Sequence, residues 1–366
     1  MTDFYSLNKI QLTNYRNIKN QVIEFGPKIT CIFGDNGNGK SNILESIYFL
    51  FNKKSFKKNT GYPQMLSLDC ENPEILIQSV IKSEEGKPHS YNLKLKHGEF
   101  EYYLDSKLVK KRLHIPTVFI NPFDAQNYFQ ISQFRRQWFD QHFSQFDERY
   151  RRLLSKYKDY LKFKNALIIN RPHQFREQIL AANYSIAPII LELSLIKKEI
   201  IAMLNNEIKK IFFKIFADDM NLELLLESSL SIQNSEEILL KLNDSLNKEL
   251  IVNKTIIGPH RDDYLLLING LNACDYSSLG QQKSSYLSLL FAYIQLFRYK
   301  FKASPIVLMD DVSGELDSLR WSHLTAFLKS GDYQVVLTTA NENFRNEVEK
   351  FEGVMRLKII NGVVIF

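Results

Sequence analysis

The sequence predicts an α/β fold in which both ends of the chain build one domain and a helical arm is inserted between them. Three observations predict it: β-rich runs over residues 1–142, helical periodicity over residues 143–250, and β-rich runs again over residues 251–366. Two sheet-forming segments on either side of a helical one are typical of an insertion into a single domain. We therefore expect an N-terminal head segment, an arm and a C-terminal head segment with these bounds.

The sheet-forming segments are recognised by short runs rich in β-branched and aromatic residues, separated by polar and turn-forming residues. In the N-terminal segment the runs are Leu7–Leu12, Gln21–Phe25, Ile29–Phe33, Ile75–Ile81, Tyr91–Leu95 and Thr117–Ile120. In the C-terminal segment they are Tyr264–Ile268, Ile306–Met309, Val335–Thr338 and Met355–Ile360. We expect these runs to be strands of the head.

The arm is predicted from apolar residues that recur at steps of three or four. These residues are Leu193, Ile196, Ile200, Leu204, Ile208, Ile211 and Ile215. The lysines between them, among them Lys197 and Lys209, are expected on the face that meets water. Such a stripe indicates a long amphipathic helix.

Composition limits the class of protein. The chain has 366 residues, of which 45% are hydrophobic, enough for a large core. No stretch approaches the length of an apolar membrane span and the N-terminus lacks a basic-then-apolar signal, so we expect a soluble, cytoplasmic protein without a membrane partner. The net charge of +6, from 47 basic and 41 acidic residues, is compatible with a polyanionic partner. The cysteines Cys31, Cys70 and Cys274 have no metal-binding spacing and imply neither zinc nor a disulfide.

One run fills every fixed position of the phosphate-binding loop pattern G-x-x-x-x-G-K-[ST]. It reads Gly34-Asp35-Asn36-Gly37-Asn38-Gly39-Lys40-Ser41, and it lies between the strand at residues 29–33 and a predicted helix that begins at Asn42. Glycines let backbone N–H groups wrap a phosphate, Lys40 can reach the outer phosphates, and the Ser41 hydroxyl can ligate Mg²⁺. The loop, with Asn42 at the helix start, predicts a site for a nucleoside triphosphate and Mg²⁺.

A second element of nucleotide chemistry follows the strand Ile306–Met309, which ends in Asp310 and Asp311. This pattern is typical of a Walker B element. Asp310 would hold Mg²⁺, and Asp311 would position or deprotonate an attacking water. The alternative is a buried strand followed by an acidic turn, which short apolar runs of this kind also form.

A third element opens a predicted helix with the run Ser278-Leu279-Gly280-Gln281-Gln282-Lys283. In ABC-type ATPases a Ser-x-Gly-Gln signature lies at a helix N-terminus, where Ser278, Gly280 and Gln281 would face a γ-phosphate. In that class the signature of one head completes the phosphate-loop site of another, so the motif predicts an ATP-dependent homodimer. The alternative is that Ser277 or Ser278 only caps the helix.

Taken together, these motifs make the chain resemble the RecF family of bacterial recombination mediators, which is related to the ABC and SMC-type ATPases. The resemblance spans nearly the whole chain. Besides the three motifs it includes Asn14-Tyr15-Arg16-Asn17, Leu44-Glu45, Asn121-Pro122-Phe123-Asp124, Arg135-Arg136, Phe139-Asp140, Leu161-Lys162-Phe163-Lys164-Asn165-Ala166-Leu167, Gly258-Pro259-His260-Arg261-Asp262-Asp263 and Gly314-Glu315-Leu316-Asp317. It implies an ABC-type ATPase head with an inserted helical arm.

The resemblance also implies smaller roles. Arg16 resembles an arginine that reaches nucleotide in SMC-type heads, and Gln126 is a possible Q-loop analogue with a catalytic role. The run Gly314–Asp317 resembles a D-loop, with Gly314 or Ser313 near the partner head. Thr338 and Thr339 stand where transporter-type ATPases place a switch histidine. For Arg16 the alternative is an ordinary surface arginine that follows a strand.

Contact with DNA has its own candidates, because phosphate recognition needs several cations on one surface. The basic clusters are Lys53, Lys54, Lys57 and Lys58; Lys107, Lys110, Lys111 and Arg112; and Arg149, Arg151, Arg152 and Lys156. Each cluster alone could equally be a solvated face. Only clusters that share one side of a dimer would form a groove.

The RecF resemblance implies an ATP-induced dimer that clamps single-stranded or gapped double-stranded DNA. Slow, DNA-stimulated hydrolysis of ATP would release it. RecR and RecO would be partners in loading a recombinase during replication-fork recovery and the damage response. Three alternatives remain at this point: a non-hydrolysing ATP-binding DNA scaffold, the ATPase subunit of a repair nuclease, and a transporter ATPase subunit.

Overall fold

The computed structural model describes residues 5–57, 60–68, 70–83, 86–110, 113, 115–216, 220–230, 234–301, 305–311, 322–324, 326–328, 331, 333–340 and 353–365. The chain forms two compact units. The head unit comprises Met1–Asp124, Lys214–Phe216 and Phe297–Phe366, and the arm unit comprises Ala125–Phe213 and Ala217–Leu296. Both ends of the chain therefore lie in one unit, which agrees with the fold class expected from the sequence.

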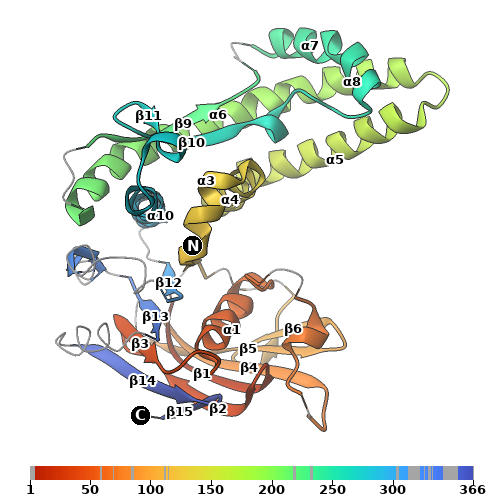
Figure 1. The fold of residues 1–366 in the computed structure, drawn as a ribbon. Helices are drawn as coiled ribbons and strands as arrows, with labels where there is room; N and C mark the ends of the chain where they lie inside the picture. Colours follow the sequence, from red (N-terminus) through yellow and green to blue (C-terminus); the bar gives the residue numbers. More distant parts are fainter. Residues whose placement is uncertain are drawn as a thin grey trace. The chain divides into compact units, whose positions relative to one another are not determined.

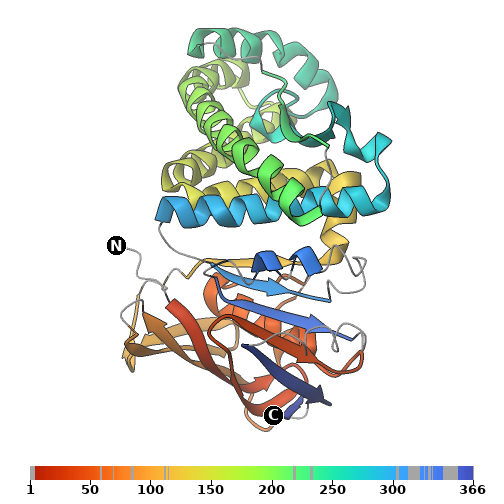
Figure 2. The same ribbon diagram turned by 90° about the vertical axis from the view of Figure 1, so that its left-hand side faces the viewer.

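The head unit contains a largely parallel sheet of six strands, in the order β15-β14-β3-β13-β12-β8. Its strands are β3 (Ile29–Phe33), β8 (Thr117–Ile120), β12 (Ile306–Met309), β13 (Val335–Thr339), β14 (Val354–Ile360) and β15 (Val363–Ile365). Only β15 runs antiparallel to its neighbour. Every residue of β12 and β13 is buried, as expected of strands covered on both faces. Strands from the two ends of the chain thus alternate within one sheet (Figure 2).

A second, antiparallel sheet in the head unit has the order β2-β1-β4-β5-β6-β7. Its strands are β1 (Tyr5–Tyr15), β2 (Ile18–Glu24), β4 (Glu74–Ser83), β5 (Pro88–Lys96), β6 (Glu99–Leu104) and β7 (Lys107–Leu108). Buried and less buried residues alternate along β4, so one face of this sheet packs on the core. The short helix α2 (Tyr62–Met65) precedes β4.

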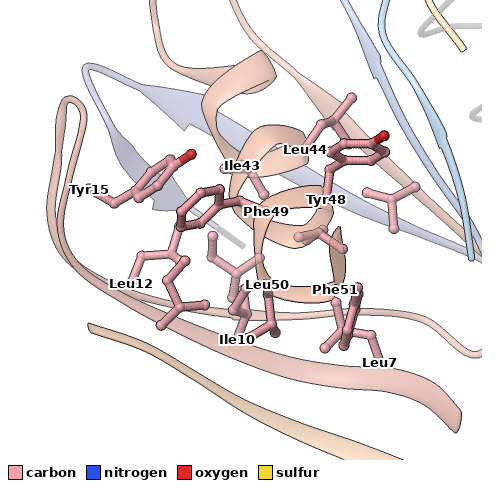
Figure 3. Packing of buried hydrophobic residues seen from close by; sticks show 14 of the residues in the cluster. Leu7, Ile10, Leu12, Tyr15, Ile43, Leu44, Tyr48, Phe49, Leu50 and Phe51 are labelled. Carbon is pink, nitrogen blue, oxygen red and sulfur yellow. The ribbon is translucent and has the colours of Figure 1, made fainter. Parts of the chain in front are cut away.

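Helix α1 (Lys40–Asn52) packs between residues of both sheets in one hydrophobic cluster. Figure 3 shows its side chains against strand β1. Leu7, Ile10 and Leu12 of β1 and Phe49, Leu50 and Phe51 of α1 belong to this cluster, and each of them is at most 2% exposed. This packing fixes the helix that carries the phosphate loop at its N-terminus, since burial of apolar side chains is the main favourable term in folding.

The arm unit is mostly helical (Figure 1). Its helices are α3 (Pro122–Gln130), α4 (Ser132–Phe146), α5 (Glu148–Asn170), α6 (Phe175–Phe216), α7 (Ser235–Asp244), α8 (Leu246–Val252), the 3₁₀ turn η1 (Pro259–Arg261), α9 (Ala273–Tyr276) and α10 (Leu279–Phe301), of which α3, α6 and α10 extend into the head unit. The amphipathic stripe predicted between Leu193 and Ile215 lies on α6, which confirms the expected long helix.

Two expectations about this unit are wrong. Lys197 does not face solvent but is 1% exposed, and its Nζ lies 2.8 Å from the Asp262 carboxylate. The run Tyr264–Ile268 is a strand, β10 (Asp263–Ile268), but it is not in the head. It pairs with β9 (Leu222–Glu227) and β11 (Leu271–Asn272) in a three-stranded sheet of the arm unit. In both cases the partner is remote in sequence, so local pattern does not reveal it.

The two compact units divide the chain after Asp124 and after Leu296. Helix α4 packs on α5 and on β10, which groups these elements with the arm. The division into three segments at residues 142 and 250 stays a prediction. Helix α6 is also long and apolar enough to cross a membrane by length and composition alone, contrary to the expectation that no stretch approaches a span. Of its most apolar 18-residue window, 44% is buried inside the structure, and the core helix of a soluble protein passes the same test.

Candidate nucleotide-binding site

The phosphate loop connects β3 to α1 in the head unit. Gly37 and Gly39 have φ angles of 87° and 104°, which a residue with a Cβ rarely adopts. Gly34 is needed for a different reason, because a Cβ there would lie 2.4 Å from the carbonyl oxygen of Ile359 in β14. Residues Asp35, Asn36 and Gly37 are exposed. The loop therefore has the backbone shape that its glycines predict, and its tip is open to solvent.

Lys40 is the first residue of α1 and is only 6% exposed. Its Nζ donates to the backbone oxygens of Gly34 (2.7 Å) and Asp35 (3.0 Å). Burial lowers the pKa of Lys40, and the nearby carboxylates of Asp311 and Asp310 oppose that shift. The ammonium group is thus held inside the loop by carbonyl oxygens that a phosphate can replace as its partners.

The Asp310 carboxylate lies at the centre of the site. Its Oδ1 accepts hydrogen bonds from the Ser41 hydroxyl (2.8 Å) and from the Thr338 hydroxyl (2.7 Å). The backbone N–H of Asp311 in turn donates to Thr338 Oγ1 (3.1 Å) and to the Thr338 carbonyl (3.2 Å). Strands β12 and β13 are parallel neighbours, so their carboxyl ends meet at the edge where the loop begins. The structure brings together Ser41 and Asp310, two residues that the sequence assigned separately to Mg²⁺.

These oxygen donors fit Mg²⁺, which usually takes one or two carboxylates, a hydroxyl, phosphate oxygens and waters. Ser41 and Asp310 supply a hydroxyl and a carboxylate already within hydrogen-bonding distance. Over the part of the chain that the structure describes, no cluster of three or more His, Cys, Asp or Glu side chains could hold a metal by itself. The expected metal would therefore depend on the nucleotide for its other ligands.

Arg16 lies beside the loop helix and forms a two-pronged ion pair with Glu45 of α1. Its Nε and Nη2 donate to the two carboxylate oxygens at 3.0 and 2.7 Å, and Glu45 is fully buried. Burial raises the pKa of Glu45, but the hydrogen bonds from Arg16 and Ser55 and the charge of Lys57 outweigh it, so the pKa is lowered. A contact of Arg16 with nucleotide stays a prediction. Sequence reasoning gave Glu45 no role, although an acid inside the apolar run of α1 was a usable signal.

Asn42, one residue after the loop, is half-buried, and both polar atoms of its side chain form hydrogen bonds. Its Nδ2 donates to Asn17 Oδ1 (2.8 Å), and its Oδ1 accepts from the Nζ of Lys57 (2.6 Å). Asn42 therefore connects the start of α1 with two neighbouring segments of the head unit.

The signature run lies in the arm unit at the start of α10. The backbone N–H of Ser278 donates to Gln281 Oε1 (2.9 Å), and the backbone N–H of Gln281 donates to Ser278 Oγ (3.3 Å). This reciprocal pair is a capping box, so the helix-capping alternative describes the chain as it stands. Ser278 and its neighbour Leu279 are exposed, Leu279 by 73%. Capping does not exclude a second role, because the helix end with its free N–H groups remains accessible.

The remaining candidates are Gln126, the D-loop segment and the basic clusters. Gln126 is exposed on α3 and belongs to the arm unit, as does the signature, whereas the loop residues belong to the head unit, so its catalytic role stays a prediction. The D-loop segment Gly314–Asp317 and Ser313 lie outside the described residues, as do Lys58, Lys111 and Arg112 of the basic clusters. On α5, Arg149 and Arg151 are paired with Glu192 and Glu148. Arg152 and Lys156, one helical turn apart, are exposed.

Comparison with known proteins gives a consistent result over the whole chain. A family model described as the RecF/RecN/SMC N-terminal domain matches residues 6–359. The DNA replication and repair protein RecF of Alkaliphilus oremlandii is 30% identical over 359 residues, which cover 91% of this chain and 93% of the relative. RecF of Staphylococcus carnosus is 28% identical and covers 96% of this chain and 98% of its own.

Solved structures agree with the sequence matches. The recombination mediator protein RecF bound to ATP, from the RecFOR pathway, superposes with a TM-score of 0.85 at 25% identity, over 99% of this chain and 97% of that one. The Smc head domain of Pyrococcus furiosus, bound to a domain of ScpA, superposes with a TM-score of 0.57 at 16% identity, over 99% of this chain and 95% of that one. The second match reflects a shared fold. The fold is therefore that of an ABC-type head with a helical insertion.

Proposed function

Because the chain belongs to the RecF family, we propose that it is an ATP-binding protein of DNA replication and repair whose nucleotide occupies the loop Gly34–Ser41. The observation that carries the proposal is the meeting of Ser41 and Asp310 at 2.8 Å. These two residues are 269 positions apart in sequence, yet they lie where the phosphate loop and the end of β12 converge.

The residues of the head unit have distinct roles in this proposal. Lys40 leaves the carbonyls of Gly34 and Asp35 and pairs with the outer phosphates of ATP. Ser41 and Asp310 would hold Mg²⁺, which would neutralise charge at the phosphates. Asp311 orients the attacking water and accepts its proton. Ser41 and Asp310 already lie together before the nucleotide arrives, and the main reorganisation on binding is that Lys40 exchanges carbonyl oxygens for phosphate oxygens.

Hydrolysis in this proposal requires a second copy of the chain. The exposed N-terminus of α10, with Ser278, Gly280 and Gln281, meets the γ-phosphate held by the partner and joins two heads. The dimer closes on single-stranded or gapped duplex DNA, and weak, DNA-stimulated hydrolysis of ATP releases it. By likeness to a relative of the RecFOR pathway, proteins of the RecR and RecO type are the expected partners in the cytoplasm.

The oligomeric state tests the composite site. Light scattering coupled to size exclusion should show a monomer without nucleotide and a dimer with ATP, Mg²⁺ and gapped DNA. Ser278→Arg should remain monomeric under the same conditions, because the new side chain occupies the place of the partner's phosphate. Ser185→Arg, which adds the same charge at an exposed site on α6, is the matched control and should dimerise. A dimer formed by Ser278→Arg as readily as by the unmodified chain would contradict the composite site.

Turnover separates an ATPase from a scaffold that only holds ATP. Phosphate release should fall to background in Lys40→Arg and in Asp311→Asn, while Asp311→Asn should still bind ATP. Equal phosphate release by all three proteins would show that the measured turnover does not come from this site, and the enzymatic assignment would fail.

A further inference from the structure

Asn17 belongs to the sequence run Asn14-Tyr15-Arg16-Asn17, and the proposed function gives it no role. It lies in the two-residue turn between β1 and β2, where Tyr15 pairs with Ile18. Its side chain is not part of the core, because the residue is exposed. A polar side chain at an exposed turn usually contacts water, but this one is directed at the phosphate loop.

The side-chain amide of Asn17 connects the C-terminal part of the loop, at Asn38, with the first turn of α1, at Asn42. Its Nδ2 donates to the backbone oxygen of Asn38, at 3.2 Å. Its Oδ1 accepts from Nδ2 of Asn42, at 2.8 Å. One side chain therefore joins the residue before Gly39 to the residue after Ser41 and encloses the segment that carries Lys40.

A second turn contacts the same loop residue. Asn361 and Gly362 connect β14 to β15. The backbone N–H of Gly362 donates to the oxygen of Asn38 (2.9 Å), and the N–H of Asn361 donates to Asn38 Oδ1 (3.2 Å). The oxygen of Asn38 thus accepts from both turns, which directs it away from the concave face where N–H groups must point for phosphate binding.

Glycine is needed at two positions where the turns and the loop approach one another closely. A Cβ on Gly39 would lie 2.7 Å from Asn17 Oδ1, and a Cβ on Gly362 would lie 2.3 Å from the backbone oxygen of Asn17. The contact at Gly34 with the Ile359 carbonyl places the first loop glycine on the same hairpin. Gly39 is therefore packed against the β1–β2 turn and Gly34 against the end of β14, in addition to the left-handed φ that Gly39 needs.

We propose that Asn17 and the Asn361–Gly362 turn form a brace that holds the phosphate loop in its binding shape before nucleotide arrives. Asn17 is a positioning residue: it acts through Asn38 and Asn42 rather than on the nucleotide. The proposal rests on the proposed function only in taking this loop as the nucleotide site. Because the hydrogen bonds of the brace in the described residues go to Asn38 of the loop and Asn42 of α1, it should support ATP and ADP alike.

Hydrogen–deuterium exchange of the full chain without nucleotide tests the brace directly. In Asn17→Ala the amides of residues 34–41 should exchange about tenfold faster, since one hydrogen bond to Asn38 of the loop and one to Asn42 in the first turn of α1 are lost. Asn20→Ala is the matched control: its side chain lies on β2 and pairs with Gln11, so exchange in the loop should not change. Asn17→Asp keeps the shape but loses the donor to Asn38, so it should also accelerate exchange, and it replaces the alanine variant if that one fails to fold.

Nucleotide titration completes the test. Dissociation constants for ATP and ADP, each with Mg²⁺, should rise about tenfold in Asn17→Ala by the same factor and stay unchanged in Asn20→Ala. Unchanged loop exchange in Asn17→Ala would overturn the proposal, as would a loss confined to ATP, which would indicate direct contact with the γ-phosphate. If the unmodified chain binds neither nucleotide, the proposed function fails, and the exchange experiment alone decides the brace.

Discussion

The two units contain equally specific sequence motifs but use their polar side chains in opposite ways. In the head unit the phosphate loop leaves its tip exposed, and Lys40 bonds only to backbone oxygens that a ligand can replace. In the arm unit the run Gly258–Asp263 turns its two acids inward. Asp262 accepts from Lys197 (2.8 Å) and Ser228 (2.7 Å) and is 2% exposed. Asp263 forms a two-pronged pair with Arg135, 2.6 Å at both contacts.

The difference teaches how to separate a site from a scaffold. The two acids of this run have side chains of the same unit as partners, and His260 is bonded to the Tyr157 hydroxyl (2.6 Å) and to the backbone oxygen of Thr255 (3.2 Å). These contacts hold helices α4, α5 and α6 against the segment that leads into β10, and both carboxylate oxygens of Asp262 accept from side chains of the unit. In the phosphate loop, by contrast, the Lys40 ammonium group bonds to backbone oxygens of Gly34 and Asp35, which a ligand can replace. A specific sequence motif therefore shows that its residues are needed, but not what they are needed for. Whether its polar groups are bonded to side chains of the same unit or to groups that a ligand can replace indicates a structural or a binding role.

The largest expected effect comes from breaking the network in the arm. Lys197→Met leaves the Asp262 carboxylate buried and without its cation, which costs about 3–5 kcal/mol of unfolding free energy. Chemical denaturation followed by circular dichroism measures it. Lys198→Met, the exposed neighbour on α6, is the control and should change little. Both variants should keep their affinity for ATP at low denaturant. If Lys197→Met loses less than about 1 kcal/mol of unfolding free energy, the contrast between the two units is not supported.

The reverse pattern is expected for Lys40→Met in the head. Lys40 is buried, and burial lowers its pKa, so removal of the charge should not destabilise the unit. ATP affinity should fall by about 100-fold, equivalent to about 2.7 kcal/mol, because the phosphates lose their direct cation. Calorimetric titration and thermal unfolding of the same samples measure the two quantities. A large loss of stability with little loss of affinity would show that Lys40 is structural.

Much of this contrast could be predicted from local sequence. The phosphate loop, the strand that ends in Asp310 and the stripe on α6 depend on spacing and periodicity, and the structure has each element where it was expected. The family and the fold class are confirmed by the comparisons. The errors concern residues whose partners are remote. Lys197 was assigned to solvent because it lies between the apolar residues of the stripe, and its partner is 65 positions away. The strand β10 was assigned to the head because it follows residue 250, but its partner β9 lies inside the predicted arm.

Some signals were present but not used. The sequence of β9, Leu222–Glu227, begins with alternating apolar and acidic residues, a strand pattern inside a region expected to be helical. Glu45 interrupts the apolar face of α1, and a fully buried acid requires a partner. Asn17 belongs to a run that the resemblance includes, but its partners, the backbone oxygen of Asn38 and the side chain of Asn42, do not follow from spacing in the sequence.

Acidification should affect the head unit through Glu45. Its pKa is lower in the folded chain than in the unfolded chain, so the stability it contributes is present above its ordinary pKa of 4.5 and is lost as the pH falls through the folded value. Unfolding midpoints of the head, followed by hydrogen exchange in α1, should decrease below about pH 4.5. In Glu45→Gln that decrease should be smaller, since the titrating group is gone. Equal pH dependence of both proteins would contradict the role of the Arg16–Glu45 pair.

The smallest effect expected is at Thr338, and it tests whether the head site is held as firmly as the arm network. Thr338→Val removes the hydroxyl that donates to Asp310 and accepts from Asp311, whose φ of 46° it helps to hold. The Mg²⁺ concentration needed for half-maximal ATP binding should rise about fivefold, since hydrogen bonds of this kind contribute about 1 kcal/mol. Thr338→Ser restores the hydroxyl and should restore Mg²⁺ affinity. If Thr338→Val needs no more Mg²⁺ than the unmodified chain, the hydroxyl does not orient Asp310.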